Sequence, residues 1–206
     1  MRVIRRTIGA VAALLAWAGC SDEDRAVAGR DGPDPRAPRI GPAGACGYRA
    51  AARLTGDGIG SLLIGRPVAE LEGDACTIVR DSIDPLGPEG APLRLLLIEM
   101  GPDTVTVEVG DDRIFRLEIG TPRIRTVSGL AVGTPLDELL ALRDLRGVTG
   151  EGRLFAVSPS HCGLSFALGR EPPGRAGTAW TWEALASLPE TLTVSRLLAY
   201  GCLPPR

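Results

Sequence analysis

LRLLLIEMGPDTVTVEVGDDRIFRLEI (residues 93–119) contains three strand-like segments in succession. Residues 93–100 are a near-continuous apolar run of strand length, residues 104–109 alternate strictly between polar and apolar, and residues 113–119 place large apolar side chains on one face. Two short turn sequences join them, GPD at 101–103 and GDD at 110–112. Three strands joined by tight turns predict an antiparallel meander.

A second pattern in the chain is a short element that occurs twice. Residues 58–71 and 129–139 share the order aliphatic–Gly–x–Pro–aliphatic–x–Glu–Leu. A proline at the first helical position and an acidic residue in the first turn are typical of helix starts. In the second copy Thr134 fits an N-cap, with Asp137 placed for a capping box. We therefore expect a short helix in the first copy and an amphipathic helix over residues 135–143 in the second.

The rest of the chain continues this alternation of helix and strands. Further strands are expected at 77–81, 153–157, 162–168 and 191–200, with a short helix at 180–187. Blocks of helix and antiparallel strands indicate an α+β fold. The sequence therefore predicts the α+β class, with antiparallel β-meanders and short helices in two repeated helix-plus-sheet units, over residues 45–126 and 127–206.

The first 19 residues have the form of a bacterial lipoprotein signal. Basic residues precede an apolar run over 8–18, which has the length of a secretory signal and is too short to span a bilayer as a helix. Small residues at 18 and 19 stand before Cys20, as the lipoprotein peptidase requires. We expect cleavage before Cys20 and lipidation of this cysteine. Export to the cell envelope follows, and Ser21 favours the outer membrane over the inner.

A competing interpretation is ordinary signal cleavage after the A-x-A sequence at 16–18, which would leave Cys20 as a free thiol. The number of cysteines argues against it. Removing Cys20 from the five leaves an even set that can pair completely: Cys46, Cys76, Cys162 and Cys202. Four cysteines allow three pairings, and we favour one bridge in each half, Cys46–Cys76 and Cys162–Cys202. Residues 20–44, rich in Gly, Pro, Ala, Asp and Arg, are expected to form a flexible linker behind the lipidated cysteine.

Composition excludes several classes of function. The sequence has no Lys, Asn or Gln. The lack of lysine excludes Schiff-base catalysis and a P-loop, and the lack of Asn and Gln excludes a carboxamide donor to an oxyanion. Its single histidine excludes a multi-histidine metal site. A formal charge of −2, without a basic cluster, argues against nucleic-acid binding. We expect no cofactor and no metal.

The candidate site residues give no recognisable catalytic set. His161 precedes Cys162, but neighbouring positions on a strand point to opposite faces, and the serines at 158 and 160 lack a nucleophile elbow. We expect His161 to be an ordinary residue at a loop end. Trp180 and Trp182 are expected to be one core and one surface aromatic residue. The alternative makes them candidate contacts for a protein partner, because tryptophan is enriched at binding hot spots.

The chain loosely resembles uncharacterised bacterial lipoproteins. The element at 58–71 and 129–139 is similar to that of the small outer-membrane assembly lipoproteins of the SmpA/OmlA type, and to tandem-repeat secreted inhibitors. The resemblance covers about 14 residues in each half. It implies binding through a concave face of helix-plus-sheet units, and it assigns no functional residue.

The function favoured by these observations is a non-catalytic, lipid-anchored envelope protein that binds another protein as an assembly factor, scaffold or inhibitor. Its partners are then the membrane, through the lipid anchor, and an unidentified envelope protein, with no nucleic acid. One alternative is an envelope enzyme that uses scattered carboxylates, with Glu70, Asp81 and Glu99 as candidates. Another is a small-ligand binder with a cavity under the sheet.

Overall fold

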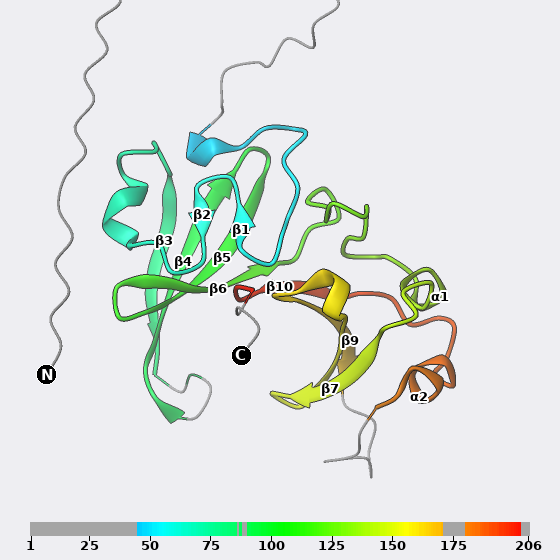
Figure 1. The fold of residues 1–206 in the computed structure, drawn as a ribbon. Coiled ribbons are helices and arrows are strands. Elements are labelled where there is room, and N and C mark those ends of the chain that lie inside the picture. Colours follow the sequence, from blue (N-terminus) through cyan, green and yellow to red (C-terminus); the bar gives the residue numbers. More distant parts are fainter. Residues whose placement is uncertain (1–44, 86, 88–89, 171–179, 203–206) are drawn as a thin grey trace, which may run out of the picture. The chain divides into compact units, whose positions relative to one another are not determined.

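Eight antiparallel strands form one sheet in the order β3-β4-β5-β6-β10-β9-β8-β7 (Figure 1). The computed structural model describes residues 45–85, 87, 90–170 and 180–202, all within one compact unit, Ile40–Arg206. The strands of the sheet are β3 (Ile78–Asp84), β4 (Leu93–Met100), β5 (Asp103–Gly110), β6 (Arg113–Ile119), β7 (Arg146–Gly150), β8 (Arg153–Val157), β9 (Leu164–Arg170) and β10 (Arg196–Ala199). The expected signal peptide (residues 1–19), Cys20 and the expected linker up to residue 44 lie outside the described residues.

The other elements are short. Two strands of two residues each form a separate antiparallel pair, β1 (Gly58–Ile59) and β2 (Leu62–Leu63). The helical elements are η1 (Ala45–Gly47), η2 (Val68–Leu71), α1 (Leu136–Leu139), η4 (Pro159–His161) and α2 (Trp182–Ala186). Across the described part of the chain, none of these helices has the length and apolar character needed to cross a membrane.

The meander expected from residues 93–119 is present as β4, β5 and β6. Leu96 of β4 pairs with Val107 of β5, which pairs in turn with Leu117 of β6. Asp111 and Asp112 both have positive φ, 49° and 57°, in the turn between β5 and β6. Two successive residues with positive φ make a hairpin turn whose twist matches that of the strands, and Asp tolerates this conformation. The alternating pattern and the turn residues therefore locate these strands well.

The expected α+β class with two repeated helix-plus-sheet units is wrong. The structure is mostly β, and β6 pairs directly with β10, so the strands of both halves belong to one sheet. Each recurring element forms one helical turn, and its backbone bonds to a segment far along the chain. The Gly65 N–H donates to the Ile114 carbonyl oxygen at 2.7 Å, and the Gly133 N–H donates to that of Val194 at 2.7 Å.

The starts of these turns also differ from the expectation. Pro67 and Pro135 precede the first helical residue and have extended backbones, with ψ of 133° and 152°. The hydroxyl of Thr134 accepts from the Ala131 N–H at 2.9 Å instead of capping α1. The expected helix over 135–143 consequently shrinks to Leu136–Leu139.

One face of the sheet carries the main hydrophobic core. Fully buried side chains from the strands meet side chains from the segments that cover this face. Strand residues of this cluster include Leu96, Ile98, Val107, Leu117, Ile119, Phe166 and Leu197, and covering residues include Leu54, Leu62, Leu71, Leu136, Leu139 and Leu185. The opposite face has a second, smaller buried cluster of Phe155, Ala167 and Leu198. The core therefore fixes the sheet from one side and leaves part of the other side open.

Two disulfides close the fold, Cys46–Cys76 and Cys162–Cys202. This is the pairing that the sequence analysis favoured, with one bridge in each half. Disulfides persist in oxidising compartments, so both bridges are compatible with a location outside the cytoplasm.

Candidate functional site

The two tryptophans named as candidate partner contacts both have contacts within the protein. Trp180 is 3% exposed and belongs to the main core. Trp182 is half-buried; its indole N–H donates to the Leu140 carbonyl oxygen at 3.1 Å, and the guanidinium carbon of Arg143 lies 4.9 Å from its ring centroid. Trp180 thus offers almost no surface to a partner, and Trp182 offers a partly covered one.

The carboxylates considered for an enzyme do not converge. Glu70 follows Arg66 by four positions and accepts from its Nε at 3.0 Å. Asp81 of β3 is paired with Arg94 at 2.7 Å, and Glu99 lies on β4 opposite Thr104. Asp81 is aligned with Leu96, three residues from Glu99, which corresponds to about 10 Å along a strand. These three groups do not form a common site.

The strongest candidate binding site is a hollow on the sheet face opposite the main core, and we call it the sheet hollow. Its volume is about 490 Å³. Five strands and one turn contribute its lining, which consists of Phe115, Arg116, Val148, Gly150, Glu151, Phe155, Val157, Ser165, Leu198 and Tyr200. The apolar side chains form most of the wall, and the rim carries two exposed aromatic residues, Phe115 and Tyr200.

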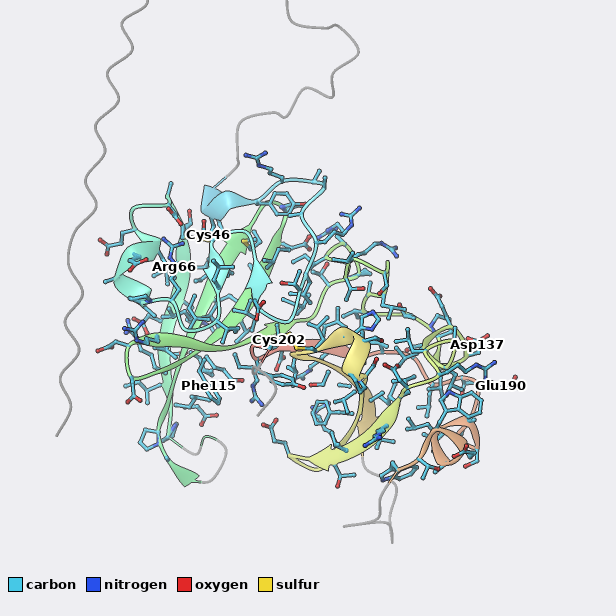
Figure 2. The ribbon with its side chains drawn as sticks, viewed as in Figure 1. Cys46, Arg66, Phe115, Asp137, Glu190 and Cys202 are labelled. Carbon is cyan, nitrogen blue, oxygen red and sulfur yellow. A yellow bond between two sulfur atoms is a disulfide. The ribbon has the colours of Figure 1, made fainter. Side chains whose placement is uncertain are left out.

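Curvature of the sheet creates this hollow. β7 and β9 bend away below β6 in the view of Figure 1, and Phe115 marks the β6 side in Figure 2. Three strand spacings separate β6 from β8 in the strand order, or about 14 Å in a flat sheet. Yet Nη1 of Arg116 on β6 lies 2.9 Å from Oε1 of Glu151, in the turn between β7 and β8. The ion pair therefore spans the concave face.

The charges beside the sheet hollow are matched within the protein. Arg116 also lies 2.7 Å from Oε1 of Glu108, which is directly opposite it on β5. Glu108 is almost fully buried, and this burial raises the pKa of its carboxyl despite the hydrogen bond from Arg116. Arg116 is the one cation among the described lining residues, and two carboxylates share it. The hollow thus presents no unmatched positive charge from its described lining.

Comparisons with known proteins bear on the fold alone. No family model matches the chain, and no curated protein matches it. The chain is similar in structure to the uncharacterized protein yfeY from Escherichia coli, with a TM-score of 0.51 and 18% sequence identity. The match covers 72% of this chain and 99% of that one. The resemblance to assembly lipoproteins and secreted inhibitors stays a prediction.

A second hollow, which we call the loop hollow, has a volume of about 390 Å³. Its lining comes from three loops and the end of the described chain: Leu54, Thr55, Gly56, Asp57, Thr126, Val127, Ser128, Ser160, His161, Cys162, Leu164 and Cys202. Cys202 lies beside the η4 turn in Figure 2, which brings the last described residue to this hollow. Ser128 and His161 are thus close in space, although 32 residues separate them in the sequence.

Metal binding has no support from the described side chains. In residues 45–85, 87, 90–170 and 180–202, no group of three or more His, Cys, Asp or Glu could hold a metal ion. The candidate chemistry is therefore that of the two hollows.

Proposed function

We propose that this chain is a lipid-anchored protein of the bacterial cell envelope that binds the apolar part of a neutral or cationic amphiphile in the sheet hollow. The observation that carries the proposal is an apolar concavity of about 490 Å³ on the sheet face opposite the main core. Small-molecule pockets occupy about 300–1,000 Å³ and are lined mainly by apolar and aromatic side chains, with a few polar groups.

The lining of the sheet hollow favours a small apolar ligand over the protein partner expected from Trp180 and Trp182. Phe155 and Leu198 form a buried floor, and Val148 and Val157 extend the apolar wall. The burial of Trp180 leaves that region without a fully exposed aromatic anchor for a partner. The hollow, in contrast, is open and offers contact from several strands at once.

The charges select the head group of the ligand. Arg116 is shared by Glu108 and Glu151, so an anionic group would meet carboxylates without gaining a free cation. A neutral or cationic head group at the rim avoids this repulsion, and Glu151 is exposed enough to face it. The proposed ligand class, a neutral or cationic amphiphile, follows because two carboxylates and only one arginine lie beside the hollow.

The lipid anchor at Cys20 is a separate part of the proposal, supported by the signal sequence and by disulfides compatible with export. Replacing Cys20 by serine should move the protein from the membrane fraction to the soluble fraction, because two or more acyl chains are needed for stable anchoring. Immunoblotting of fractionated cells measures the distribution. Mass spectrometry of the N-terminal peptide of the unaltered protein gives the direct readout, and a Cys20 without acyl chains would contradict lipidation at this residue.

Val148→Asp tests the sheet hollow. Val148 is 46% exposed on the edge strand β7, so its replacement leaves the main core intact. A carboxylate in the apolar wall should weaken binding of the neutral dye Nile red by about tenfold or more, since burying an unpaired charge is costly. Fluorescence titration of the unit Ile40–Arg206 measures this, because that unit contains the sheet and both disulfides.

Val79→Asp is the matched control, since Val79 is 53% exposed on β3 and does not line the hollow. It should bind Nile red like the unaltered protein. Dodecyltrimethylammonium should displace the dye at lower concentration than dodecyl sulfate. Equal weakening by both valine replacements, or stronger competition by the sulfate, would reject the proposed site or its charge preference.

A further inference from the structure

Five polar side chains beside the loop hollow form a continuous hydrogen-bonded series, which we call the Ser–His chain. Ser128 Oγ lies 2.7 Å from Nε2 of His161, and the other ring nitrogen, Nδ1, lies 3.2 Å from Ser160 Oγ. Ser160 Oγ is 2.7 Å from Ser158 Oγ, which donates to Oδ1 of Asp144 at 2.6 Å. Loops from three parts of the chain thus connect a serine to a carboxylate through the single histidine.

The chain has one direction of proton donation, set by its carboxylate end. Asp144 accepts, so the Ser158 hydroxyl uses its proton on Asp144 and must accept from Ser160. Ser160 therefore accepts from the N–H at Nδ1 of His161. This tautomer leaves a lone pair at Nε2, and Ser128 donates its hydroxyl proton there. The serine hydroxyl is accordingly aligned with a base.

Asp144 is held as an anion. Its Oδ2 accepts from the Ser160 N–H at 2.9 Å, while Oδ1 accepts from Ser158. The hydrogen bond from the Ser158 hydroxyl, with further help from Ser160, lowers the pKa of the Asp144 carboxyl. A carboxylate that orients a histidine through its Nδ1 side is the arrangement of a nucleophilic triad, here extended by two hydroxyls.

Packing fixes the imidazole as well. The backbone N–H of His161 donates to the Ser158 carbonyl oxygen at 2.9 Å within the η4 turn. The ring meets Phe166 edge to face, with centroids 6.0 Å apart and an angle of 71°. Phe166 is fully buried in the main core, so the base rests on a rigid support.

Ser128 is held at the tip of a turn. Its Oγ accepts from the hydroxyl of Thr126 at 2.9 Å, because its own proton is donated to His161. Thr126 is buried, and its Oγ1 accepts from the Leu130 N–H at 3.0 Å. The Gly129 N–H closes the turn by donating to the Thr126 carbonyl oxygen at 3.0 Å. Ser128 itself is exposed and lines the loop hollow. Substrate can therefore reach its hydroxyl.

We propose that the Ser–His chain is a hydrolytic site for carboxylic esters with small apolar acyl groups, in which Ser128 is the nucleophile and His161 the general base. The loop hollow is lined beside this pair by Leu54, Val127 and Leu164, which suit an apolar acyl group. Asp144, Ser158 and Ser160 are positioning residues. The site shares no lining residue with the sheet hollow. Ester hydrolysis would therefore be an activity separate from ligand binding in the sheet hollow.

The reaction balances without a cofactor. Ser128 Oγ forms a bond to the acyl carbon while its proton passes to His161 Nε2; the bond from that carbon to the alcohol oxygen then breaks, and the alcohol leaves with the proton. A water molecule next gives a proton to Nε2 and attacks the acyl carbon. The bond to Ser128 Oγ breaks, the proton returns to that oxygen, and a carboxylic acid is released.

The full chain, purified in mild detergent, tests the proposal with p-nitrophenyl acetate and p-nitrophenyl butyrate and with a fluorophosphonate probe. Both esters should be hydrolysed, and mass spectrometry should locate the phosphonyl group on Ser128. Ser128→Ala should abolish labelling, and His161→Ala should lower kcat/KM by about 100-fold or more, the range typical of a lost general base. Ser187→Ala is the matched control, because this exposed serine lies after α2 and does not line the loop hollow.

Asp144→Asn tests the direction of the Ser–His chain. Its amide can donate to Ser158, which releases the constraint on the histidine tautomer. We expect kcat to fall by about tenfold or more with KM nearly unchanged, because a general base contributes fully only when its imidazole is correctly oriented.

Three results would overturn the proposal: no hydrolysis and no labelling by the folded protein, labelling at another serine, or full activity of Ser128→Ala. Circular dichroism of each variant establishes that it is folded. Nile red binding to the unit Ile40–Arg206, prepared without detergent and carrying the same substitutions, reports on the sheet hollow independently, so failure of one proposal is distinguishable from failure of the other.

Discussion

Replacing both Cys162 and Cys202 by serine is expected to lower the free energy of unfolding by about 4 kcal/mol. The bridge joins residues 40 positions apart, between the start of β9 and the end of β10. Without the bridge, the conformational entropy of the unfolded chain increases, while that of the folded chain stays nearly the same. The unfolded state is therefore favoured. For a domain of this size, such a loss is a large part of the total stability.

The disulfide Cys162–Cys202 lies at a tightly packed junction, so removing it also affects neighbouring segments. A β-carbon at Gly56 would lie 1.9 Å from the Cys162 carbonyl oxygen, so the two backbones are in contact. The Cys202 N–H also donates to Oδ1 of Asp57 at 2.9 Å. Loosening this junction should disturb the loop hollow, and ester hydrolysis should fall together with stability.

Urea denaturation of the unaltered protein and of the double variant measures this effect, with Cys46→Ser/Cys76→Ser as the comparison. The second bridge closes a separation of 30 residues, so its removal should cost nearly the same. Dithiothreitol should destabilise the unaltered protein more than either variant, because each variant has one bridge fewer to reduce. A loss below about 1 kcal/mol for the Cys162 and Cys202 pair would show that this bridge adds little.

Local patterns predicted the strands better than the helices, for a physical reason. Alternation along β5 and the apolar run of β4 depend on neighbouring residues, and these strands lie within one residue of the expected bounds. The Pro67 and Pro135 elements instead contain true helix-start residues whose backbone groups bond to Ile114 and Val194, far along the chain. Tertiary hydrogen bonds overrode a correct local preference.

Long-range pairing was also beyond the sequence pattern. The register that joins the halves, with Leu197 opposite Ile119, depends on two strands that are far apart in the sequence. β7 was missed because its sequence, RGVTG, has two glycines and no run of apolar residues. Without this long-range register and without β7, the sequence pattern predicted two separate units where the structure has one sheet.

The candidate sites were predictable only in part. A cavity on the sheet was an alternative in the sequence analysis, but its lining comes from five strands whose curvature no local pattern encodes. Adjacent positions on a strand exclude a catalytic pair of His161 and Cys162, but they give no information about residues distant in the sequence. The structure places Ser128 against His161 instead, and Ser128 lies in a segment, TVSGL, that carries no motif.

Phe166→Ala is expected to cost about 3–5 kcal/mol, the range for removing a large aromatic side chain from a core. Phe166 is 0% exposed on β9, between Leu197 of β10 and Ala156 of β8. Its removal leaves a cavity under the centre of the sheet, since the paired strands on both sides prevent collapse. It also removes the edge-to-face support of His161. Stability and ester hydrolysis should therefore decrease together.

Phe115→Ala provides the matched control for the loss of a phenyl ring. Phe115 is 58% exposed on β6, so its removal should change the free energy of unfolding by less than about 1 kcal/mol. Phe166→Leu should recover part of the stability because it refills most of the cavity, but it should not restore the aromatic contact with His161. Urea denaturation and ester hydrolysis of the three variants separate these effects. If Phe166→Ala and Phe115→Ala were equally stable, the core placement of Phe166 would be wrong; if Phe166→Leu regained full kcat, packing volume alone would be enough to position the imidazole.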